Sequence, residues 1–205
     1  MTVPVRPPRV SRRAVLKGGA LTIAFALSGR GDDLFAQDGS SSPRILDPKE
    51  VDGFLAVNGD GTVTVFCGKV DLGQGLRIAI RQMAAEELGI GVDKIKYVEG
   101  DTALTPDQGR TSGSSGIQRG GVQIRQAAAT ARKALIELAA QRLGSKPDDL
   151  VAVDGQVRPN AGGAGISFAD LIGERRFDLK IDPKAPLKDP STYTIVGKPL
   201  PRPDV

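Results

Sequence analysis

The sequence predicts an α/β (α+β) domain in which two main helices pack on one small mixed sheet, with a flexible N-terminal leader and an extended Pro-rich C-terminal tail. Two long runs, at 74–88 and from 117 or 121 to 143, repeat apolar side chains at spacings of three and four, which is the period of a helix. Short alternating runs rich in valine and isoleucine lie before and between them, as strands do. Frequent prolines in 182–205 exclude a regular helix there.

The region 1–36 is predicted to be a twin-arginine export signal. Residues 11–17, Ser-Arg-Arg-Ala-Val-Leu-Lys, closely resemble the twin-arginine motif, and a mostly apolar stretch follows at 18–27. This stretch is shorter than the roughly 20 residues of a membrane-spanning helix and suits the apolar core of a signal. We therefore expect a periplasmic protein that is exported already folded, with a linker at 37–50. A basic disordered tail is the alternative interpretation of the leader.

The basic character of the chain is confined to this leader. The chain has 28 Lys/Arg and 24 Asp/Glu, of which residues 1–44 hold seven Lys/Arg and three Asp/Glu. The rest of the chain therefore holds 21 of each sign, and its net charge is zero. The rest of the chain therefore has no basic excess of the kind that binds nucleic acid. The absence of histidine and the single cysteine exclude Ser-His-Asp or Cys-His catalysis, histidine zinc sites and an internal disulfide. We expect no catalytic or metal-ligating residue here, so the chemistry would come from a cofactor or a partner.

A hairpin is expected at the start of the folded part. The runs 53–57 and 62–67 have β-type composition, and the Asn-Gly-Asp-Gly sequence at 58–61 between them is a strong turn signal. Cys67 ends the second run on the same face as its valines. We therefore expect Cys67 to be a small buried packing residue rather than a reactive thiol.

The first helix is expected over 74–88, with Gly89 ending it. A strand at 95–99 and a polar loop at 100–116 follow. The second helix runs to 143, and its many alanines indicate close packing against another element. Glu86 and Glu87 fall within the first helix, and we expect them to be solvated or paired rather than catalytic.

Beyond the second helix the signals are weaker. A strand pair is expected at 150–153 and 156–158, followed by a short helix at 167–172. The segment 182–205 has no amphipathic period and is expected to be an extended link to a missing domain. The domain itself is therefore assigned to 51–181.

Two glycine-rich loops are of interest because each joins a strand to a helix. A helix N-terminus offers free N–H groups and a positive dipole end, which suit a phosphate or another anion. If the two preceding strands lie side by side, both loops open at the same edge of the sheet. Each loop alone would be weak evidence, but together they predict one binding site for an anionic group. The candidate residues are Gly73, Gln74 and Gly75 in the first loop and Thr111, Ser112, Ser114 and Ser115 in the second.

Several stretches follow a known sequence pattern: 68–75 (Gly-Lys-Val-Asp-Leu-Gly-Gln-Gly), 84–88 (Ala-Ala-Glu-Glu-Leu), 100–107, 113–121 and 195–204. In these stretches the chain resembles the N-terminal portion of the molybdopterin-binding large subunits of the molybdenum hydroxylases, in the xanthine dehydrogenase and aldehyde oxidase family. The most similar branch is the exported one of the isoquinoline 1-oxidoreductase β subunit and nicotinate dehydrogenase. The twin-arginine leader fits that branch as well.

The resemblance implies a molybdenum cofactor, either molybdopterin or molybdopterin cytosine dinucleotide. In the family the Gly-Gln-Gly loop contacts the pterin, which implies that role for Gly73, Gln74 and Gly75. The Gly/Ser loop binds the phosphates of the cofactor, which implies that role for Thr111, Ser112, Ser114 and Ser115. The chain departs from the family at Gly116, where a further hydroxyl residue is common, so the serine that takes each phosphate contact stays open.

The resemblance also implies an oxidoreductase that hydroxylates an aldehyde or an N-heterocycle with oxygen from water. A glutamate near the C-terminus of the full-length subunit acts as base in the family and has no counterpart here, so we expect this chain to be inactive alone. Its expected partners are the remainder of the large subunit, a 2Fe-2S small subunit, a cytochrome electron acceptor and a small-molecule substrate. The alternative is a non-enzymatic exported assembly or partner-binding module derived from the same fold.

Overall fold

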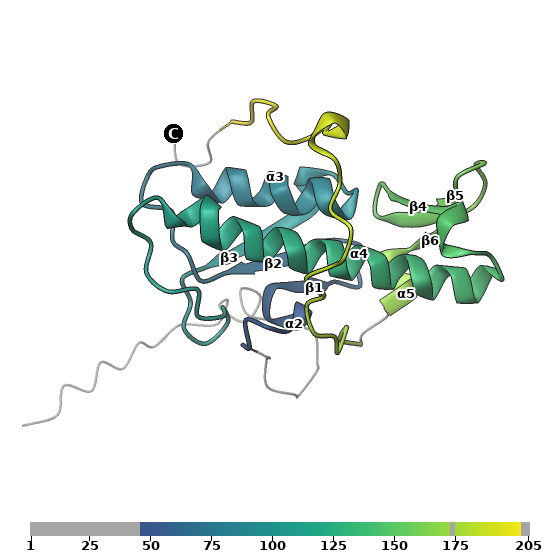
Figure 1. Ribbon diagram of the computed structural model, residues 1–205, viewed down its shortest axis with the longest axis horizontal. Helices are drawn as coiled ribbons and strands as arrows, with labels where there is room; N and C mark the ends of the chain where they lie inside the picture. The colour runs from purple at the N-terminus through teal and green to yellow at the C-terminus, as the bar shows by residue number, and fades with distance from the viewer. Residues whose placement is uncertain (1–45, 173–174, 202–205) are drawn as a thin grey trace, which may run out of the picture. The chain divides into compact units, whose positions relative to one another are not determined.

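The computed structural model describes residues 46–172 and 175–201 (Figure 1). The predicted export signal at 1–36 and most of the predicted linker at 37–50 lie outside the described residues. The described part has the predicted α/β character, with helices and two small sheets. None of the helices in this part has both the length and the apolar character that crossing a membrane requires.

The first sheet has three strands in the order β1-β2-β3. β1 (Leu55–Val57) pairs antiparallel with β2 (Val63–Cys67), and β2 pairs in parallel with β3 (Ile95–Glu99), so the sheet is mixed. The predicted turn is confirmed, because the Asn58 N–H donates to the Thr62 carbonyl at 2.8 Å. Cys67 is fully buried, as its position on β2 predicts.

The predicted first strand at 53–57 is wrong in its first two residues. They belong to a helical turn, α2 (Val51–Phe54), whose residues are all buried. The Asp52 carboxylate in this turn accepts the N–H groups of Phe177 and Asp178 at 2.9 and 2.7 Å. This contact between distant segments fixes the turn, and a local pattern of alternating residues carries no information about it.

The helix α3 (Leu76–Leu88) connects the parallel strands β2 and β3, with a short turn η2 (Val92–Lys94) before β3. It begins two residues later than predicted, because Gly75 adopts a left-handed φ of 79°. Gly89 ends it in a left-handed conformation, as expected.

The helix α4 (Val122–Leu143) packs beside α3 (Figure 1). A π-helical turn, η3 (Gly116–Gly121), leads into it, at the place where the sequence left two alternative starts. The close approach of the two helices requires a small residue, since a Cβ added at Gly121 would lie 3.0 Å from the Met83 methyl carbon.

The strands after α4 form a second sheet, which confirms the predicted strand pair at 150–153 and 156–158 and shows that it lies apart from the mixed sheet. β4 (Leu150–Val153), β5 (Gln156–Pro159) and β6 (Ile166–Ser167) pair antiparallel in that order, between the turn η4 (Pro147–Asp149) and the helix α5 (Phe168–Ile172). The physical reason is the length of α4, which at 22 residues extends about 33 Å. Its C-terminal half needs its own apolar cover, which β4, β5 and α5 provide.

The closing segment 175–201 is extended, which confirms the prediction of an extended tail from 182 as far as the structure describes it, with one short turn η5 (Pro190–Thr192). It runs along α4 and α3 (yellow in Figure 1) and is bonded to Glu86 and Glu87 on α3. Both glutamates are buried and paired, which is one of the two states expected for them. The sequence did not indicate this attachment, and continuation of the segment into a further domain stays a prediction.

Candidate functional site

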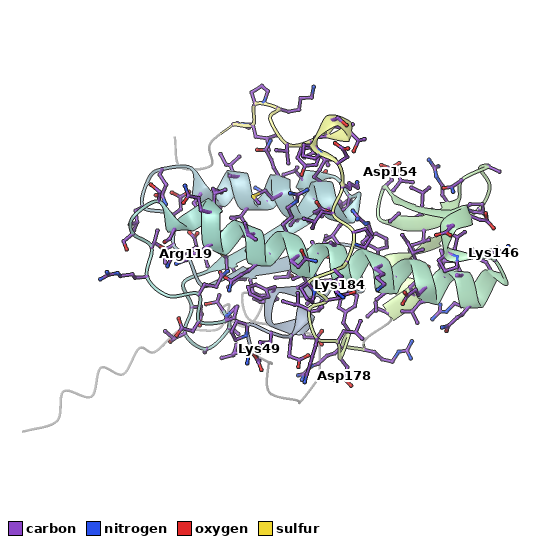
Figure 2. The ribbon with its side chains drawn as sticks, in the orientation of Figure 1. Lys49, Arg119, Lys146, Asp154, Asp178 and Lys184 are labelled. Carbon is purple, nitrogen blue, oxygen red and sulfur yellow. The ribbon has the colours of Figure 1, made fainter. Side chains whose placement is uncertain are left out.

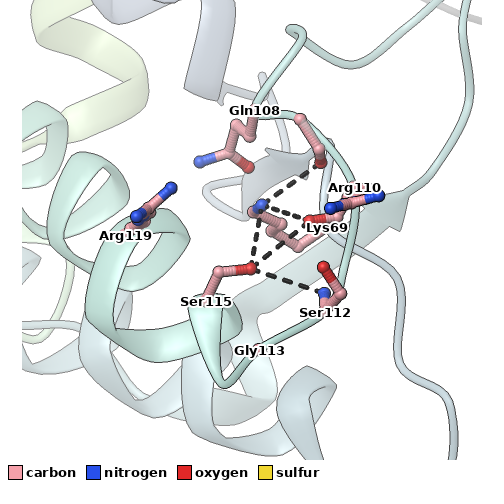
Figure 3. Close-up of a pocket in the computed structure, with 8 residues that line it drawn as sticks. Lys69, Gln108, Arg110, Ser112, Gly113, Ser115 and Arg119 are labelled. Atoms are coloured by element: carbon pink, nitrogen blue, oxygen red, sulfur yellow. Dashed lines mark hydrogen bonds between the residues drawn. The ribbon is translucent and has the colours of Figure 1, made fainter.

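A pocket of about 380 Å³ opens where the loop after β2 meets the loop after β3 (Figure 3). The two strands are parallel neighbours, so their carboxyl ends lie at the same edge of the sheet, as the prediction of a shared site requires. Figure 2 places Arg119 at this end of α4 and Lys146 at the other end. The pocket is lined by Lys69, Gln108, Gly109, Arg110, Ser112, Gly113, Ser115 and Arg119.

Lys69 is the buried cation of the pocket wall. The residue is 2% exposed, and its Nζ donates to the carbonyl oxygens of Gly109 at 3.2 Å and Arg110 at 2.7 Å and to Oγ of Ser115 at 3.3 Å. All three acceptors are neutral, and no carboxylate of the described residues lies within 4.0 Å of Nζ. A Cβ added at Gly120 would lie 2.7 Å from Cγ of Lys69, so η3 rests directly on the lysine stem.

Gln108 joins the end of β2 to the start of α4. Its Oε1 accepts the N–H of Gly68 at 2.9 Å and the thiol of Cys67 at 3.3 Å. Its Nε2 donates to the Gly120 carbonyl at 3.2 Å and to Oε1 of Gln123 at 2.8 Å. One amide side chain therefore fixes the two elements that frame the pocket.

The pocket carries positive charge that no lining residue offsets. Lys69, Arg110 and Arg119 line it, whereas no Asp or Glu in the part of the chain that the structure describes does. Neither arginine forms an ion pair with a carboxylate in the described part of the chain. Ser112 and Ser115 add hydroxyl groups to this set. Cations and hydroxyl donors around one pocket fit the phosphate of a cofactor, or another anion.

The first loop places its own carboxylate at the helix end where the sequence predicted an anion. Oδ1 of Asp71 accepts the N–H groups of Gly73 at 2.9 Å and Gly75 at 3.2 Å, and Oδ2 accepts that of Arg77 at 3.0 Å. Burial acts to raise the pKa of Asp71, but these three donors outweigh it and hold the pKa below its usual value. Asp71 therefore caps α3, and an acidic residue shortly before a helix is the sequence signal that could have revealed it.

The three candidate residues of the first loop lie outside the pocket lining. Gln74 is exposed and bonds within its own loop, since Oε1 accepts the Leu72 N–H at 2.6 Å and Nε2 donates to the Val70 carbonyl at 3.4 Å. Gly73 and Gly75 donate to Asp71. The contact of this loop with the pterin stays a prediction.

The four candidate residues of the second loop have different positions. Ser112 and Ser115 line the pocket, whereas Thr111 and Ser114 do not. Oγ1 of Thr111 accepts the Val70 N–H at 2.8 Å and so joins the second loop to the first. Ser114 is exposed and turns the chain with a positive φ of 59°. The structure thus brings two of the four hydroxyl residues into the pocket, and their phosphate contacts stay a prediction.

Sequence reasoning missed two of the three residues that give the pocket its charge, Lys69 and Arg119. A signal for Lys69 was available, because the alternation of β2 continued past Cys67 places residue 69 on the same buried face. Arg119 lies beside the second loop and carried no comparable signal, whereas Arg110 is the one cation within that loop and contributes to its predicted suitability for a pyrophosphate. A charged residue on an apolar face is the pattern that would have identified Lys69.

Comparisons with known proteins identify the family. Residues 17–199 match the model of the molybdopterin cofactor-binding domain. The chain is 43% identical over 152 residues to a subunit of the nicotinate dehydrogenase of Pseudomonas putida, a match that covers 74% of this chain and 13% of that protein. It is 35% identical over 124 residues to the gamma subunit of the 6-hydroxypseudooxynicotine dehydrogenase complex of Paenarthrobacter nicotinovorans, covering 60% and 16% of the two chains.

Solved structures agree with this match. Quinoline 2-oxidoreductase from Pseudomonas putida 86 aligns with a TM-score of 0.50 at 28% identity, and CO dehydrogenase from Oligotropha carboxidovorans with 0.52 at 26%. Each alignment covers 58% of this chain and 15% of the other. The chain therefore spans between 13% and 16% of the length of these four proteins. Since the family match includes both loops of the pocket, the chain belongs to the molybdopterin cofactor-binding domain family.

Proposed function

We propose that the chain forms part of the cofactor site in the large subunit of an exported molybdenum hydroxylase. Its pocket holds the phosphate-bearing end of molybdopterin or of molybdopterin cytosine dinucleotide. The observation that carries this proposal is that three cations line the pocket, one of them buried, and that no carboxylate of the described residues does. A phosphate supplies the missing negative charge and accepts hydrogen bonds from guanidinium and hydroxyl groups.

The residues of this chain contribute binding rather than a reacting group. When bound, the cofactor supplies the molybdenum centre at which the substrate is oxidised. Arg110 and Arg119 hold its anionic end, and Gln108 keeps the end of β2 and the start of α4 in place around it. The reaction we propose is hydroxylation of an aldehyde or N-heterocycle with oxygen from water. The names of two relatives, a nicotinate dehydrogenase and a quinoline 2-oxidoreductase, support an N-heterocycle.

The complete enzyme requires more than this chain. Leu72 is 72% exposed, Val122 56% and Ile117 41%, and all three lie in the first loop, in η3 or at the start of α4. Apolar side chains this exposed are typical of a surface that another domain covers. We propose that the remainder of the large subunit covers them, and that a 2Fe-2S subunit and a cytochrome carry the electrons away. Twin-arginine export places the assembly in the periplasm, and the chain alone is inactive.

The test is the cofactor content of the chain when it is co-expressed with the remainder of its subunit. Arg110→Gln combined with Arg119→Gln removes two pocket cations, and we expect molybdenum and pterin content to fall by about tenfold or more. Lys96→Gln combined with Lys133→Gln is the matched control, since it removes two exposed cations outside the pocket. Molybdenum is measured by mass spectrometry and pterin by fluorescence. Equal content in the two double variants contradicts the proposal.

A further inference from the structure

We propose that Lys69 is a binding residue of this pocket: its buried ammonium provides the charge that selects a phosphate-type polyanion, and it fixes the loop that surrounds the ligand. The inference rests on the proposed function, because it names the residue through which the same pocket recognises its ligand. Lys69 lies within the stretch 68–75 and within the family match, but neither assigns it a role. Its position in the structure does.

The charge of Lys69 is uncompensated although its hydrogen bonds are complete. An ammonium has three N–H donors, and each has one acceptor, at distances from 2.7 to 3.3 Å. A buried ammonium is nevertheless costly unless a negative charge offsets it. The exposed Lys96 and Lys133 have such a charge, in carboxylates at 2.9 and 3.0 Å, whereas Lys69 has none among the described residues. In this proposal the ligand of the pocket supplies the counter-charge.

The same three bonds position other groups that line the pocket. Lys69 holds Oγ of Ser115, which also lies 3.3 Å from the Arg110 carbonyl oxygen and 3.5 Å from the Ser112 N. Lys69 and Ser115 therefore set the shape of the loop from 109 to 115. Arg110 and Arg119 are exposed and provide the direct contacts in this proposal, while Lys69 contributes its charge and the order of the loop. Three cationic side chains line the pocket, and no Asp or Glu of the described residues does. This charge favours a ligand with several negative charges over a monoanion.

The experiment measures binding of inorganic pyrophosphate to the full chain by isothermal titration calorimetry. Lys69→Met keeps the length of the side chain and its apolar stem but removes the ammonium. Lys96→Met is the matched control, because it removes the same charge from an exposed position on β3. We expect Lys69→Met to weaken binding by about tenfold to a hundredfold, and Lys96→Met to change it by less than about twofold. Far-ultraviolet circular dichroism and thermal unfolding without ligand report whether each variant folds.

A second variant tests the position of the lysine without changing any charge. In Gly120→Ala the new Cβ would lie 2.7 Å from Cγ of Lys69, so the lysine stem must move. We expect weaker pyrophosphate binding here as well. Should Lys69→Met fail to fold, this variant decides, and unchanged binding by Gly120→Ala then overturns the inference.

The outcomes separate this inference from the proposed function. Wild-type affinity in Lys69→Met, or equal losses in Lys69→Met and Lys96→Met, overturns the role of Lys69. Absence of pyrophosphate binding by the wild-type chain overturns it too. In each of these cases the cofactor content of the Arg110 and Arg119 double variant still decides the proposed function independently.

Discussion

The pocket and the attachment of the closing segment both bury charged side chains beside α3 and α4, but they balance this charge differently. In the attachment, formed by Glu86, Glu87 and the segment 182–198, each carboxylate meets cations and N–H groups of the same chain. In the pocket, Lys69 meets only neutral oxygens among the described residues. The carboxylates of Glu86 and Glu87 have their counter-charges within the chain and hold the closing segment in place. The ammonium of Lys69 has no counter-charge among the described residues, which is the reason we propose a ligand site there.

The attachment shows how completely a buried charge can be matched. Glu87 contacts Nε of Arg125 at 2.7 Å and Nη1 of Arg132 at 2.9 Å, and it accepts the Lys188 N–H at 3.1 Å. Arg125 in turn donates to the Lys188 carbonyl at 2.8 Å. Glu86 accepts three consecutive N–H groups, of residues 194–196, at 3.0, 2.6 and 3.0 Å. Two neighbouring glutamates of one helix thus hold the extended segment in place.

The largest effect on the free energy of unfolding is expected when the carboxylate of Glu87 is removed from its ion pairs with Arg125 and Arg132. Glu87→Gln leaves two partly buried guanidinium groups without their carboxylate, and we expect the free energy of unfolding to fall by about 3–5 kcal/mol. Urea unfolding measures it. Glu137→Gln, at an exposed position of the neighbouring α4, is the control and is expected to cost less than about 0.5 kcal/mol. A loss no greater than that of the control contradicts the structural role of Glu87.

The second prediction concerns the loss of stability at low pH. Burial acts to raise the pKa of Glu86, but the three N–H donors and the Lys188 ammonium outweigh it and hold the pKa below the ordinary value of 4.5. A carboxylate with a lowered pKa contributes stability that is complete above the ordinary value and is lost as pH falls through the folded value. We therefore expect acid to destabilise the wild type more than Glu86→Gln, by about 1–2 kcal/mol below about pH 4.5. Urea titrations at several pH values check this, and parallel profiles would contradict it.

The third prediction concerns the free energy of unfolding when the unmatched charge of the pocket, Lys69, is removed. Lys69→Met without ligand removes a buried charge that lacks a counter-charge but leaves three oxygen acceptors without their donor, so the free energy of unfolding should fall by about 1–3 kcal/mol, less than in Glu87→Gln. Urea unfolding under the conditions used for Glu87→Gln provides the comparison. A loss as large as that of Glu87→Gln would show that Lys69 is structural.

The smallest effect on stability is expected in the first loop. Gln74→Ala combined with Ser114→Ala removes two exposed side chains, so the free energy of unfolding should change by less than about 0.5 kcal/mol. The sequence prediction that these residues contact the cofactor requires molybdenum and pterin content to fall in the co-expressed protein. Unchanged content in this variant would restrict the cofactor contacts to the residues that line the pocket.

The elements that local patterns determine were predictable from the sequence. β3, the hairpin turn and the glycine ends of both helices follow from period, turn chemistry and left-handed glycines. The strand pair β4 and β5 was predicted as well, whereas the turn α2 and the path of the closing segment were missed, because each depends on contacts between distant residues. The Asp52 bonds to Phe177 and Asp178 are an example.

The site divides in the same way. The sequence located both loops, since a strand, a glycine-rich loop and a helix can be identified one after another. It did not distinguish the hydroxyls that face the pocket, Ser112 and Ser115, from those that do not. That distinction depends on Lys69 reaching from one loop to the carbonyl groups of the other. Asp71 was missed for a different reason, because the side chain that satisfies the end of α3 comes from within the loop itself.

A crystal structure of the chain assembled with the remainder of its subunit, and loaded with cofactor, would decide whether the pocket is the phosphate site. We expect a phosphate of the cofactor in the pocket lined by Lys69, Ser115 and Arg119, within ion-pair distance of at least one of the two cations. Phosphate density beside Gln74 at the start of α3, with the pocket filled only by water, would contradict this assignment.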